Sequence, residues 1–487
     1  MQEHRFEVAV IGAGSAGLAA WQAASNHTDS VALIEGGIPG TTCARVGCMP
    51  SKLLIAAANA AHQARHAAPF GVRLDGEVRV DGEAVMTRVR QERDRFVGHV
   101  LESMESIPDS CRYQGMARFE DAHTLLIGDD IRLTAGRIVI ATGSRPAIPE
   151  PLETAGDRLV TSDTVFEWRT LPESVAVFGP GTTGLELAQA LARLGVRVRL
   201  FGQHGSLGVL TDDKVIAQCE RLFNEEFYLD TRGDAEIVER HGDQVRVRFT
   251  DRRSSESRTE SFDHALIATG RQPNVDRLEL PRAGLALDER GMPEVDRHTL
   301  RCRNGNGEFG HIYMAGDVDN DTPVLHEATD EGNIAGDNAG RGKGVYAAPR
   351  RSPLSIAFCE PQMARVGPGH AALAEQYGDR LSVSEFSYEN QGRARIMAAN
   401  RGYLRLYGEY GSGRFLGAEL CAPAGEHLAH LLAWAHQQAL SVPEMLGMPF
   451  YHPTLEEGLQ TALRELSARL LLKPAMENQC MECGPGA

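Results

Sequence analysis

The sequence contains 487 residues, more than one hydrophobic core supports, and predicts about three domains. Hydrophobic residues make up 42% and charged residues 24%, which is ordinary for a globular protein. The formal net charge of −16 argues against nucleic acid or an anionic membrane as the main partner. No run approaches the ~18 apolar residues of a membrane span, and residues 1–6 lead directly into an apolar strand without a targeting segment. We therefore expect a cytoplasmic protein with no membrane partner.

The first predicted elements are a strand at 7–11, a glycine turn at 12–17, an alanine-rich helix and a strand at 31–35. Gly12, Gly14 and Gly17 let the backbone turn tightly and approach a pyrophosphate at the helix N-terminus. Glu35 ends the second strand, where a carboxylate can accept hydrogen bonds from ribose hydroxyls. This pattern predicts a dinucleotide-binding unit.

Two cysteines, Cys43 and Cys48, follow this unit in the sequence, and the segment Met-Pro-Ser-Lys at 49–52 comes directly after them. If Cys48 starts a helix, the helix dipole and a nearby cation favour its thiolate. A redox-active pair is the main hypothesis, because close pairs in a reducing compartment are more often catalytic or metal-binding than structural. Half of a zinc site is the alternative, but no second pair of ligands lies nearby in the sequence.

A second unit with the same pattern begins near residue 174, with Gly179, Gly181 and Gly184 in its turn. A glycine turn needed only for packing is a poor explanation for two copies, so two dinucleotides are expected to bind. The strand at 196–201 ends without the carboxylate that usually selects NAD. Arg197 and Arg199 lie on this strand and are equally well explained as solvent-facing positions, so the choice between NAD and NADP stays open.

The remaining elements complete an α/β protein with a different C-terminal part. Alternation at 244–250 predicts an antiparallel strand, and a loop at about 340–353 marks the last boundary. Strands are predicted at 383–388, 402–407 and 415–421, and amphipathic helices at about 426–440 and 455–472. The final stretch, 474–487, holds a second close pair, Cys480 and Cys483, and is predicted to be flexible. The other five of the nine cysteines are scattered singly, unlike a secreted disulfide framework.

The segment 452–457 is the other candidate catalytic segment. His452 could move the proton that thiol–disulfide exchange requires, with Glu457 orienting it. Thr454 with Glu457 three positions on is also a capping box that starts the last helix, which would make His452 a loop residue. Spacing alone does not decide between the two interpretations.

Together these segments resemble the pyridine nucleotide–disulfide oxidoreductases, the family of dihydrolipoamide dehydrogenase, glutathione reductase and mercuric reductase. The matching pieces follow the family order over nearly the whole chain: 12–17, 40–52, the two Ala-Thr-Gly turns at 141–143 and 268–270, 179–186, 315–317 and 452–457. The resemblance implies a homodimer of chains with two Rossmann-like dinucleotide-binding domains and an α+β C-terminal dimerisation domain. FAD would bind 1–150 with 271–345, NAD(P)H would bind 151–270, and 346–473 would form the dimer interface, followed by the tail 474–487.

The resemblance also implies residue roles. Cys48 would be the flavin-facing thiolate and Cys43 the sulfur that exchanges with substrate. Lys52, paired with Glu186, would sit by the isoalloxazine, and Asp317 would hold the ribityl chain. His452 and Glu457 would be an acid/base pair supplied by the other subunit. The expected cofactor-binding residues are Gly12, Gly14, Gly17, Glu35, Gly40, Thr41, Thr42, Lys52, Ala141, Thr142, Gly143, Gly179, Gly181, Gly184, Gly270 and Asp317.

Within the family, Ser51 resembles both the dihydrolipoamide dehydrogenase and the mercuric reductase branches. His452 resembles the dihydrolipoamide dehydrogenase branch, which predicts a lipoyl group as the disulfide substrate. Phe450 departs from it, since a further histidine is common at that position. The Cys480/Cys483 pair resembles the tail cysteines of mercuric reductases, although with two residues between them. A reductase of another disulfide or of a soft metal ion, with that pair as a metal or accessory redox site, is therefore the alternative. A flavin-bound redox sensor without turnover is a third hypothesis, which the intact catalytic set disfavours.

Overall fold

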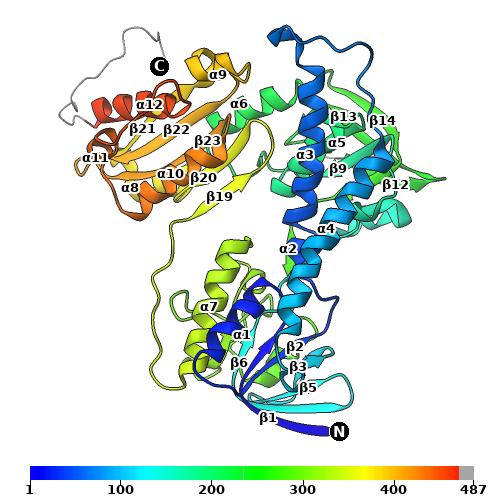
Figure 1. Cartoon of the computed structure of the whole chain (residues 1–487), viewed down its shortest axis with the longest axis vertical. Helices are drawn as coiled ribbons and strands as arrows, with labels where there is room; N and C mark the ends of the chain where they lie inside the picture. The colour runs from blue at the N-terminus through cyan, green and yellow to red at the C-terminus, as the bar shows by residue number, and fades with distance from the viewer. Residues whose placement is uncertain (234, 471–487) are drawn as a thin grey trace. The chain divides into compact units, whose positions relative to one another are not determined.

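The computed structural model describes residues 1–233 and 235–470. Within this part, the chain divides into two compact units (Figure 1). Unit 1 contains Met1–Pro50, Arg88–Ala147 and Arg271–Arg350. Unit 2 contains the described residues of Ser51–Thr87, Ile148–Gly270 and 351–470. The boundaries at Pro50 and Thr87 fall inside helices α3 (Cys48–Arg65) and α4 (Gly82–Glu105).

Unit 1 is built on a mainly parallel sheet in the order β17-β18-β6-β1-β2-β3. Five of these strands run parallel: β1 (Gln2–Ile11), β2 (Val31–Glu35), β3 (Arg112–Gln114), β6 (Ile131–Ile140) and β18 (Phe309–Met314). Three further strands pair antiparallel with their neighbours: β17 (Arg301–Arg303) with β18, β5 (Thr124–Ile127) with β6, and β4 (Ala117–Phe119) with β5. The apolar ends of β1 and β2 are buried, as expected for parallel strands that are covered on both faces.

Helices α1 (Ser15–Ser25) and α7 (Leu325–Arg341) lie side by side in unit 1 (Figure 1). Small residues allow this approach, because α7 presents glycine at every fourth position: Gly332, Gly336 and Gly340. A Cβ on any of them would lie within 2.7 Å of a carbonyl oxygen of α1, at Ala16, Ala20 and Ala24 respectively. The alanine-rich helix after the first glycine turn is thus one half of a closely packed helix pair.

Unit 2 contains a parallel sheet in the order β11-β10-β9-β15-β8. Its strands are β8 (Leu159–Thr161), β9 (Ser174–Phe178), β10 (Arg197–Phe201), β11 (Tyr228–Asp230) and β15 (His264–Ile267). Helix α5 (Thr182–Arg193) follows β9, and α6 (Asp213–Phe223) follows β10. A small antiparallel sheet is formed by β12 (Ala235–His241), β13 (Gln244–Asp251) and β14 (Glu256–Phe262). The predicted strand at 244–250 is β13.

The C-terminal part of unit 2 is an antiparallel sheet in the order β19-β20-β23-β22-β21. Its strands are β19 (Leu354–Ala357), β20 (Gln362–Val366), β21 (Leu381–Ser387), β22 (Tyr403–Glu409) and β23 (Phe415–Ala422). Its helices are α8 (His370–Tyr377), α9 (Gly392–Ile396), α10 (Gly425–Gln437), α11 (Val442–Leu446) and α12 (Glu456–Arg469). All of β23 is buried, because α10 packs on it and β20 and β22 flank it.

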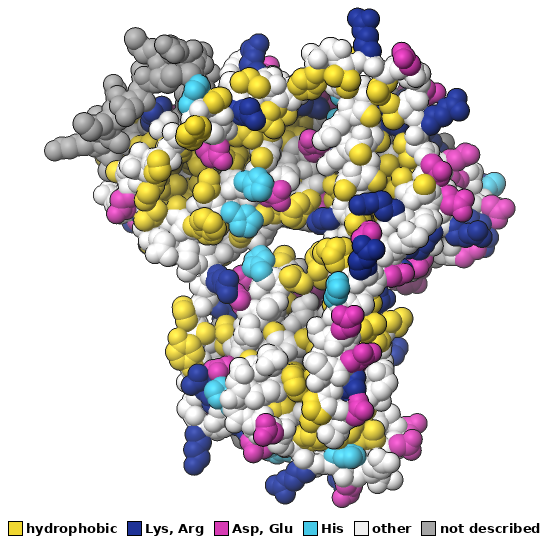
Figure 2. Space-filling model, in the orientation of Figure 1, with side chains coloured by type: hydrophobic (Ala, Val, Ile, Leu, Met, Phe, Trp, Pro, Cys, Tyr) yellow, Lys and Arg dark blue, Asp and Glu magenta, His cyan; other side chains and the backbone are white. Residues whose placement is uncertain are grey.

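The predicted fold class is confirmed: two parallel dinucleotide-type sheets and an α+β C-terminal part. The division into three domains at the boundaries given above remains a prediction. The tail 474–487, with Cys480 and Cys483, lies outside the described residues. No helix among residues 1–233 and 235–470 is long and apolar enough to cross a membrane. Figure 2 shows acidic and basic side chains intermixed over the visible face.

Candidate active site

The first glycine turn, between β1 and α1, is built for close backbone approach. Gly12 has φ +104°, and a Cβ on it would lie 2.3 Å from the Ala141 carbonyl oxygen. A Cβ on Gly17 would lie 1.8 Å from the Gly12 carbonyl oxygen, whereas one on Gly14 would meet nothing within 4 Å. Gly12 and Gly17 therefore serve packing, and Gly14 leaves open space at the N-terminus of α1. This arrangement fits a pyrophosphate.

Glu35, at the end of β2, lies beside the same turn. Its Oε2 accepts a hydrogen bond from the Ala13 N–H at 2.7 Å, and its Oε1 accepts one from the Gly37 N–H at 2.6 Å. The carboxylate thus lies at the sheet edge where the sequence places a ribose contact, and it also braces the turn itself, which the sequence did not indicate.

Asp317 approaches the Ala-Thr-Gly turn at 141–143. Its Oδ2 accepts a hydrogen bond from Ser144 Oγ at 3.1 Å, and Ser144 Oγ in turn accepts one from Arg271 Nε at 2.8 Å. Thr142 Oγ1 donates to the Asn274 carbonyl at 2.9 Å, and β7 (Ser144–Pro146) pairs with β16 (Arg271–Pro273). Sequence analysis missed Ser144 and Arg271, whose only signal is their position directly after the two Ala-Thr-Gly turns.

The second glycine turn, between β9 and α5, repeats the geometry of the first. Gly179 has φ +102° and a Cβ on it would lie 2.3 Å from the Ala268 carbonyl oxygen, while one on Gly184 would lie 1.9 Å from the Gly179 carbonyl oxygen. A Cβ on Gly181 would meet nothing within 4 Å, and Gly270 has φ +113°. Open space at the N-terminus of α5 thus fits a second pyrophosphate.

Arg197 and Arg199 of β10 are both engaged by Glu260 of β14. Arg199 makes a two-pronged ion pair, with Nε 2.8 Å and Nη2 2.6 Å from the two carboxylate oxygens. Arg197 Nη1 lies 3.0 Å from Glu260 Oε2. This geometry supports the structural interpretation of the two arginines over a role at the nucleotide.

The loop before the cysteine pair is held in unusual backbone conformations. Gly40 has φ +116°, and a Cβ on it would lie 2.8 Å from Val97 Cγ1 of α4. Thr41 has φ +57°, a region that costs a non-glycine residue energy. Its Oγ1 accepts a hydrogen bond from the Ala44 N–H at 3.2 Å and caps the short helix α2 (Thr42–Arg45).

Cys43 lies on α2 and is half-buried, whereas Cys48 is exposed and is the first residue of α3. A Cβ on Gly47 would lie 3.2 Å from Cys43 Cα, so the chain turns back and brings residue 47 against residue 43. Cys48 stands at a helix N-terminus, as the sequence predicted, where the dipole and the N–H groups of the first turn stabilise negative charge.

Lys52 follows Cys48 by one helical turn on α3 and is paired as predicted. Its Nζ lies 2.7 Å from Glu186 Oε2 of α5 and 4.7 Å from the centre of the Phe358 ring. The second oxygen of Glu186 accepts the Phe358 N–H at 2.7 Å. The Glu186 side chain is 3% exposed, so Lys52 has a fixed, buried counter-ion.

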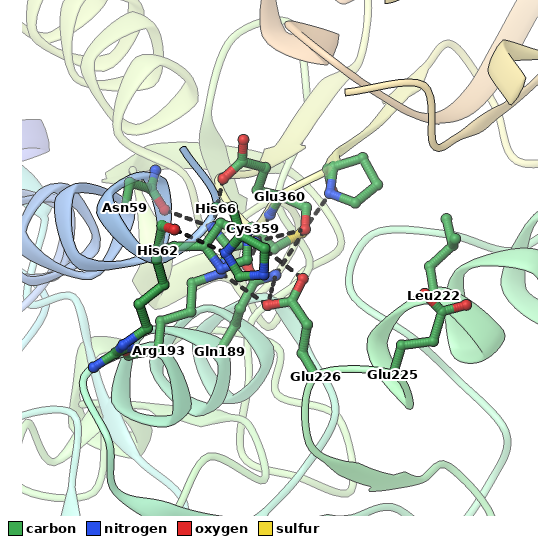
Figure 3. A network of polar contacts seen from close by, with 12 residues as sticks. Asn59, His62, His66, Gln189, Arg193, Leu222, Glu225, Glu226, Cys359 and Glu360 are labelled. Atoms are coloured by element: carbon green, nitrogen blue, oxygen red, sulfur yellow. Dashed lines mark hydrogen bonds and ion pairs between the residues drawn. The ribbon is translucent and has the colours of Figure 1, made fainter. Parts of the chain in front are cut away.

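Beyond this pair, a partly buried polar network joins α3, α5, Glu226 and Glu360 (Figure 3). Gln189 of α5 exchanges hydrogen bonds with the Glu360 backbone, through Nε2 at 2.7 Å and Oε1 at 2.8 Å. Arg193 of α5 binds Glu226 through Nε at 2.8 Å and Nη2 at 3.0 Å, and it also pairs with Glu360. Arg193 Nη1 donates to Asn59 of α3 at 2.8 Å.

This network changes the titration of the groups within it. Burial raises the pKa of Glu226, but the hydrogen bond and charge of Arg193 outweigh burial and hold that pKa below its usual value. Burial lowers the pKa of His62 on α3, and the Arg193 guanidinium lowers it further. Arg193, itself only 4% exposed in its side chain, is therefore the cation on which the network depends.

We expect Arg193→Met to destabilise unit 2 by about 3 kcal/mol, the lower end for a broken buried ion pair, because the buried Glu226 loses its nearest cation and keeps Arg401 at 3.7 Å. Arg380→Met is the matched control, since Arg380 pairs with Glu409 at the surface and such pairs contribute about 0–1 kcal/mol. Urea unfolding followed by tryptophan fluorescence measures both. Equal unfolding midpoints for the two variants would contradict this account of the network.

His452 and Glu457 come together at the start of α12. His452 Nδ1 lies 2.7 Å from Glu457 Oε1, and Glu457 Oε2 accepts the Thr454 N–H at 3.0 Å. Glu457 is buried, whereas the His452 side chain is 49% exposed. The two interpretations of the sequence therefore coexist, because one carboxylate orients the histidine and satisfies a backbone N–H before the helix. Thr454 Oγ1 donates to the Tyr451 carbonyl instead of completing the capping box.

Comparison with known proteins identifies the class. Residues 6–332 match the pyridine nucleotide-disulphide oxidoreductases and residues 354–463 match the dimerisation domain of that group. The chain belongs to this family. A mercuric reductase of Streptomyces lividans is 32% identical over 96% of this chain and 98% of its own length. A dihydrolipoyl dehydrogenase of Haloferax volcanii is 31% identical over 94% of this chain and 95% of its own length.

Solved structures agree on the fold. LpdA from Mycobacterium tuberculosis superposes with a TM-score of 0.79 at 24% identity, covering 95% of this chain and 99% of that one. The HOCl-induced flavoprotein disulfide reductase RclA from Escherichia coli superposes with a TM-score of 0.77 at 23% identity, covering 95% and 99%.

The family membership establishes an oxidoreductase that uses FAD and NAD(P)H. The two open glycine turns at Gly14 and Gly181 fit two dinucleotides, and Glu35 lies beside the first of these turns. The dimerisation domain supports a homodimer.

Proposed function

We propose that the chain is a dihydrolipoyl dehydrogenase-type enzyme that oxidises the dithiol of a lipoyl group at the Cys43–Cys48 pair. The observation that carries this proposal is the His452–Glu457 pair, 2.7 Å apart. Oxidation of a dithiol releases two protons and needs a base, whereas reduction of a soft metal ion places no proton on its product. A buried carboxylate that orients a histidine is a base suited to the dithiol reaction.

The chemistry of the chain's own residues follows from these positions. One substrate thiolate attacks Cys43 Sγ, the Cys43–Cys48 bond breaks, and its electron pair leaves with Cys48 as a thiolate at the N-terminus of α3. The second substrate sulfur displaces Cys43 from the mixed disulfide and closes the lipoyl disulfide. Cys43 leaves the mixed disulfide as the second thiolate. His452 accepts the proton of the first substrate thiol and releases it to solvent before it accepts that of the second, with Nδ1 engaged by Glu457 and proton transfer assigned to Nε2.

Bound FAD supplies two-electron chemistry between this dithiol and the nicotinamide. We assign the cofactor-facing role to Lys52, whose counter-ion Glu186 is fixed by the Phe358 N–H. Asp317, held by Ser144, is assigned to the ribityl hydroxyls. We further propose that His452 and Glu457 act in the partner subunit's site, as the dimerisation domain of this family supports.

Turnover with two substrates tests the proposal against its alternative. We expect lipoamide-dependent oxidation of NADH or NADPH, and reduction of NAD+ or NADP+ by dihydrolipoamide, at rates that Hg(II) does not match. Faster oxidation of NADPH with Hg(II), lost in a Cys480→Ala/Cys483→Ala variant, would favour the mercuric reductase relatives. Background rates with every disulfide and with Hg(II) would favour a redox sensor.

A basic side chain reaches the loop after β10, and we propose that it discriminates between the nucleotides. The loop turns back over the second glycine turn, since the Gly208 N–H donates to the Pro180 carbonyl at 2.7 Å. A Cβ on Gly205 would lie 2.5 Å from Arg232 Nε, so the guanidinium rests on this loop. Guanidinium groups bind phosphate strongly.

We therefore expect Arg232→Ala to lower kcat/KM for NADPH about tenfold, the effect of losing one charged hydrogen bond, with NADH changed by less than about twofold. Arg197→Ala is the control, because Glu260 holds Arg197 on the strand. An equal loss of kcat/KM with NADPH and NADH would show that Arg232 maintains the conformation of the loop and does not bind the phosphate of NADPH.

A further inference from the structure

We propose that Glu331 of α7 is a positioning residue of the FAD site, which holds the Gly316 N–H and so fixes the turn that carries Asp317. This rests on the proposed role of Asp317 at the cofactor. Glu331 does not itself contact the cofactor in this proposal. It acts through the backbone of the residue before Asp317.

The contacts of Glu331 define this role. The residue is 3% exposed, and its Oε2 accepts the Gly316 N–H at 2.7 Å. Its Oε1 pairs with Arg350 Nη2 at 2.5 Å. Gly316 has φ +80°, and a Cβ on it would lie 2.8 Å from Ala16 Cβ, so this turn is pressed against α1. A hydrogen bond to a carboxylate is about twice as strong as one between neutral groups.

Gly332, the residue after Glu331, packs against α1 close to the first glycine turn. A Cβ on Gly332 would lie 2.2 Å from the Ala16 carbonyl oxygen. Ala16 stands two residues after Gly14, in the first turn of α1. Glu331 thus holds the segment that carries Asp317, and Gly332, the next residue of α7, packs against α1, whose N-terminus would face the pyrophosphate. Helix α7 therefore sets the distance between these two cofactor contacts.

The charged residues around Glu331 determine which variants test the Glu331–Gly316 hydrogen bond alone. A cavity of about 230 Å³ lies beside Glu331, and its charged lining residues are Glu331, Arg350, Asp319, Asp321 and Arg297. Arg350 also pairs with Glu327 at 2.8 Å, so it keeps a carboxylate partner when Glu331 is altered. Burial, with the charge of Glu331 adding to it, raises the pKa of Asp319 to about 7. Burial, with the charge of Glu327 adding to it, raises the pKa of Glu331 as well, so the variants are compared at one fixed pH.

Two substitutions separate reach from charge. Glu331→Gln keeps a carbonyl oxygen at the same reach for the Gly316 N–H and removes the charge. Glu331→Asp keeps the charge and withdraws the carboxylate by one methylene. We expect the holoenzyme of E331D to release FAD at least about tenfold faster on dilution, as for a lost charged hydrogen bond, and E331Q to stay within about threefold of the wild-type rate. Flavin fluorescence follows the release.

The reverse order, with E331Q fast and E331D near wild type, would overturn the proposal, because the ion pair with Arg350 would then be the property that matters. Glu331→Met, which has similar length and no acceptor, makes the same prediction as E331D if that variant does not fold. Glu327→Gln is the control, since Glu327 contacts Arg350 and not Gly316; its FAD release should be unchanged.

Asp317→Ala distinguishes the failure of this inference from that of the site assignment. If Glu331 acts through Asp317, the double variant E331D/D317A releases FAD at the rate of D317A alone. An additive double variant overturns the inference. Normal FAD retention by D317A, with fast release by E331D, removes Asp317 from the cofactor site and overturns the route proposed for Glu331.

Discussion

Replacement of Cys43 by serine is expected to abolish disulfide reduction, with a loss of at least about 10³-fold in kcat, while FAD stays bound. A serine hydroxyl cannot form the disulfide with Cys48 that stores the electron pair, nor the mixed disulfide with substrate. Most contacts assigned to FAD, at the first glycine turn, Glu35 and Asp317, do not use the Cys43 side chain, and serine keeps nearly the same size beside Gly40, Thr41 and Thr42. Lipoamide turnover and the flavin absorbance of the purified variant measure the two effects.

Cys111→Ser is the matched control for this prediction. Cys111 is also half-buried and lies in unit 1, but outside the close pair. The control should keep full turnover and full flavin content. Lipoamide turnover by Cys43→Ser above a few per cent of wild type would contradict the assignment of Cys43. Loss of FAD from that variant would show that the Cys43 side chain is itself needed to hold the cofactor.

The second large effect is expected for His452→Gln, which should slow the disulfide half-reaction about 10²- to 10⁴-fold, the usual contribution of a general base. The glutamine side chain can occupy the position of the imidazole and donate a hydrogen bond to Glu457, but it cannot accept a proton at neutral pH. Reduction of the flavin by NAD(P)H moves no substrate thiol proton and should change by less than about twofold. Stopped-flow absorbance measures the two half-reactions separately.

The exposed His241, the last residue of β12, provides the matched control, His241→Gln. Glu457→Gln should lie between His452→Gln and wild type, because its amide can still satisfy the Thr454 N–H but no longer carries the charge that stabilises a protonated His452. An equal slowing of both half-reactions by His452→Gln would count against a proton-transfer role and favour a structural one.

The parts of the site that could be predicted from the sequence have local signals. Both glycine turns follow an apolar strand and precede a helix, and the structure places Gly12 and Gly179 in matching backbone conformations. The position of Glu35 at a strand end could be predicted because the apolar run at 31–34 directly before it is visible in the sequence. The His452–Glu457 pair was only half predictable, because Glu457 suits both a cap with Thr454, three positions before it, and a catalytic pair with His452, five positions before it. The structure contains features of both.

The remaining parts depend on contacts between distant segments. Ser144 meets Asp317 across 173 positions, and Arg193 meets Glu360 across 167. Charged residues such as Arg193 and Glu331 usually lie at the surface, so their sequence context suggests solvated positions. The helix α7 was not predicted either, because glycine is unfavourable in helices and Gly332 and Gly336 are explained only by the backbone of α1 against them.

Anaerobic titration of the purified protein with NADH, and separately with NADPH, tests the central claim most directly. If Cys43 and Cys48 form the redox pair, the first equivalent of reductant produces a long-wavelength absorption band while the flavin remains oxidised, as a thiolate beside it would cause. Lipoamide added next should abolish the band and regenerate the starting spectrum. Bleaching of the flavin by the first equivalent, without that band, would contradict the passage of electrons through Cys43 and Cys48.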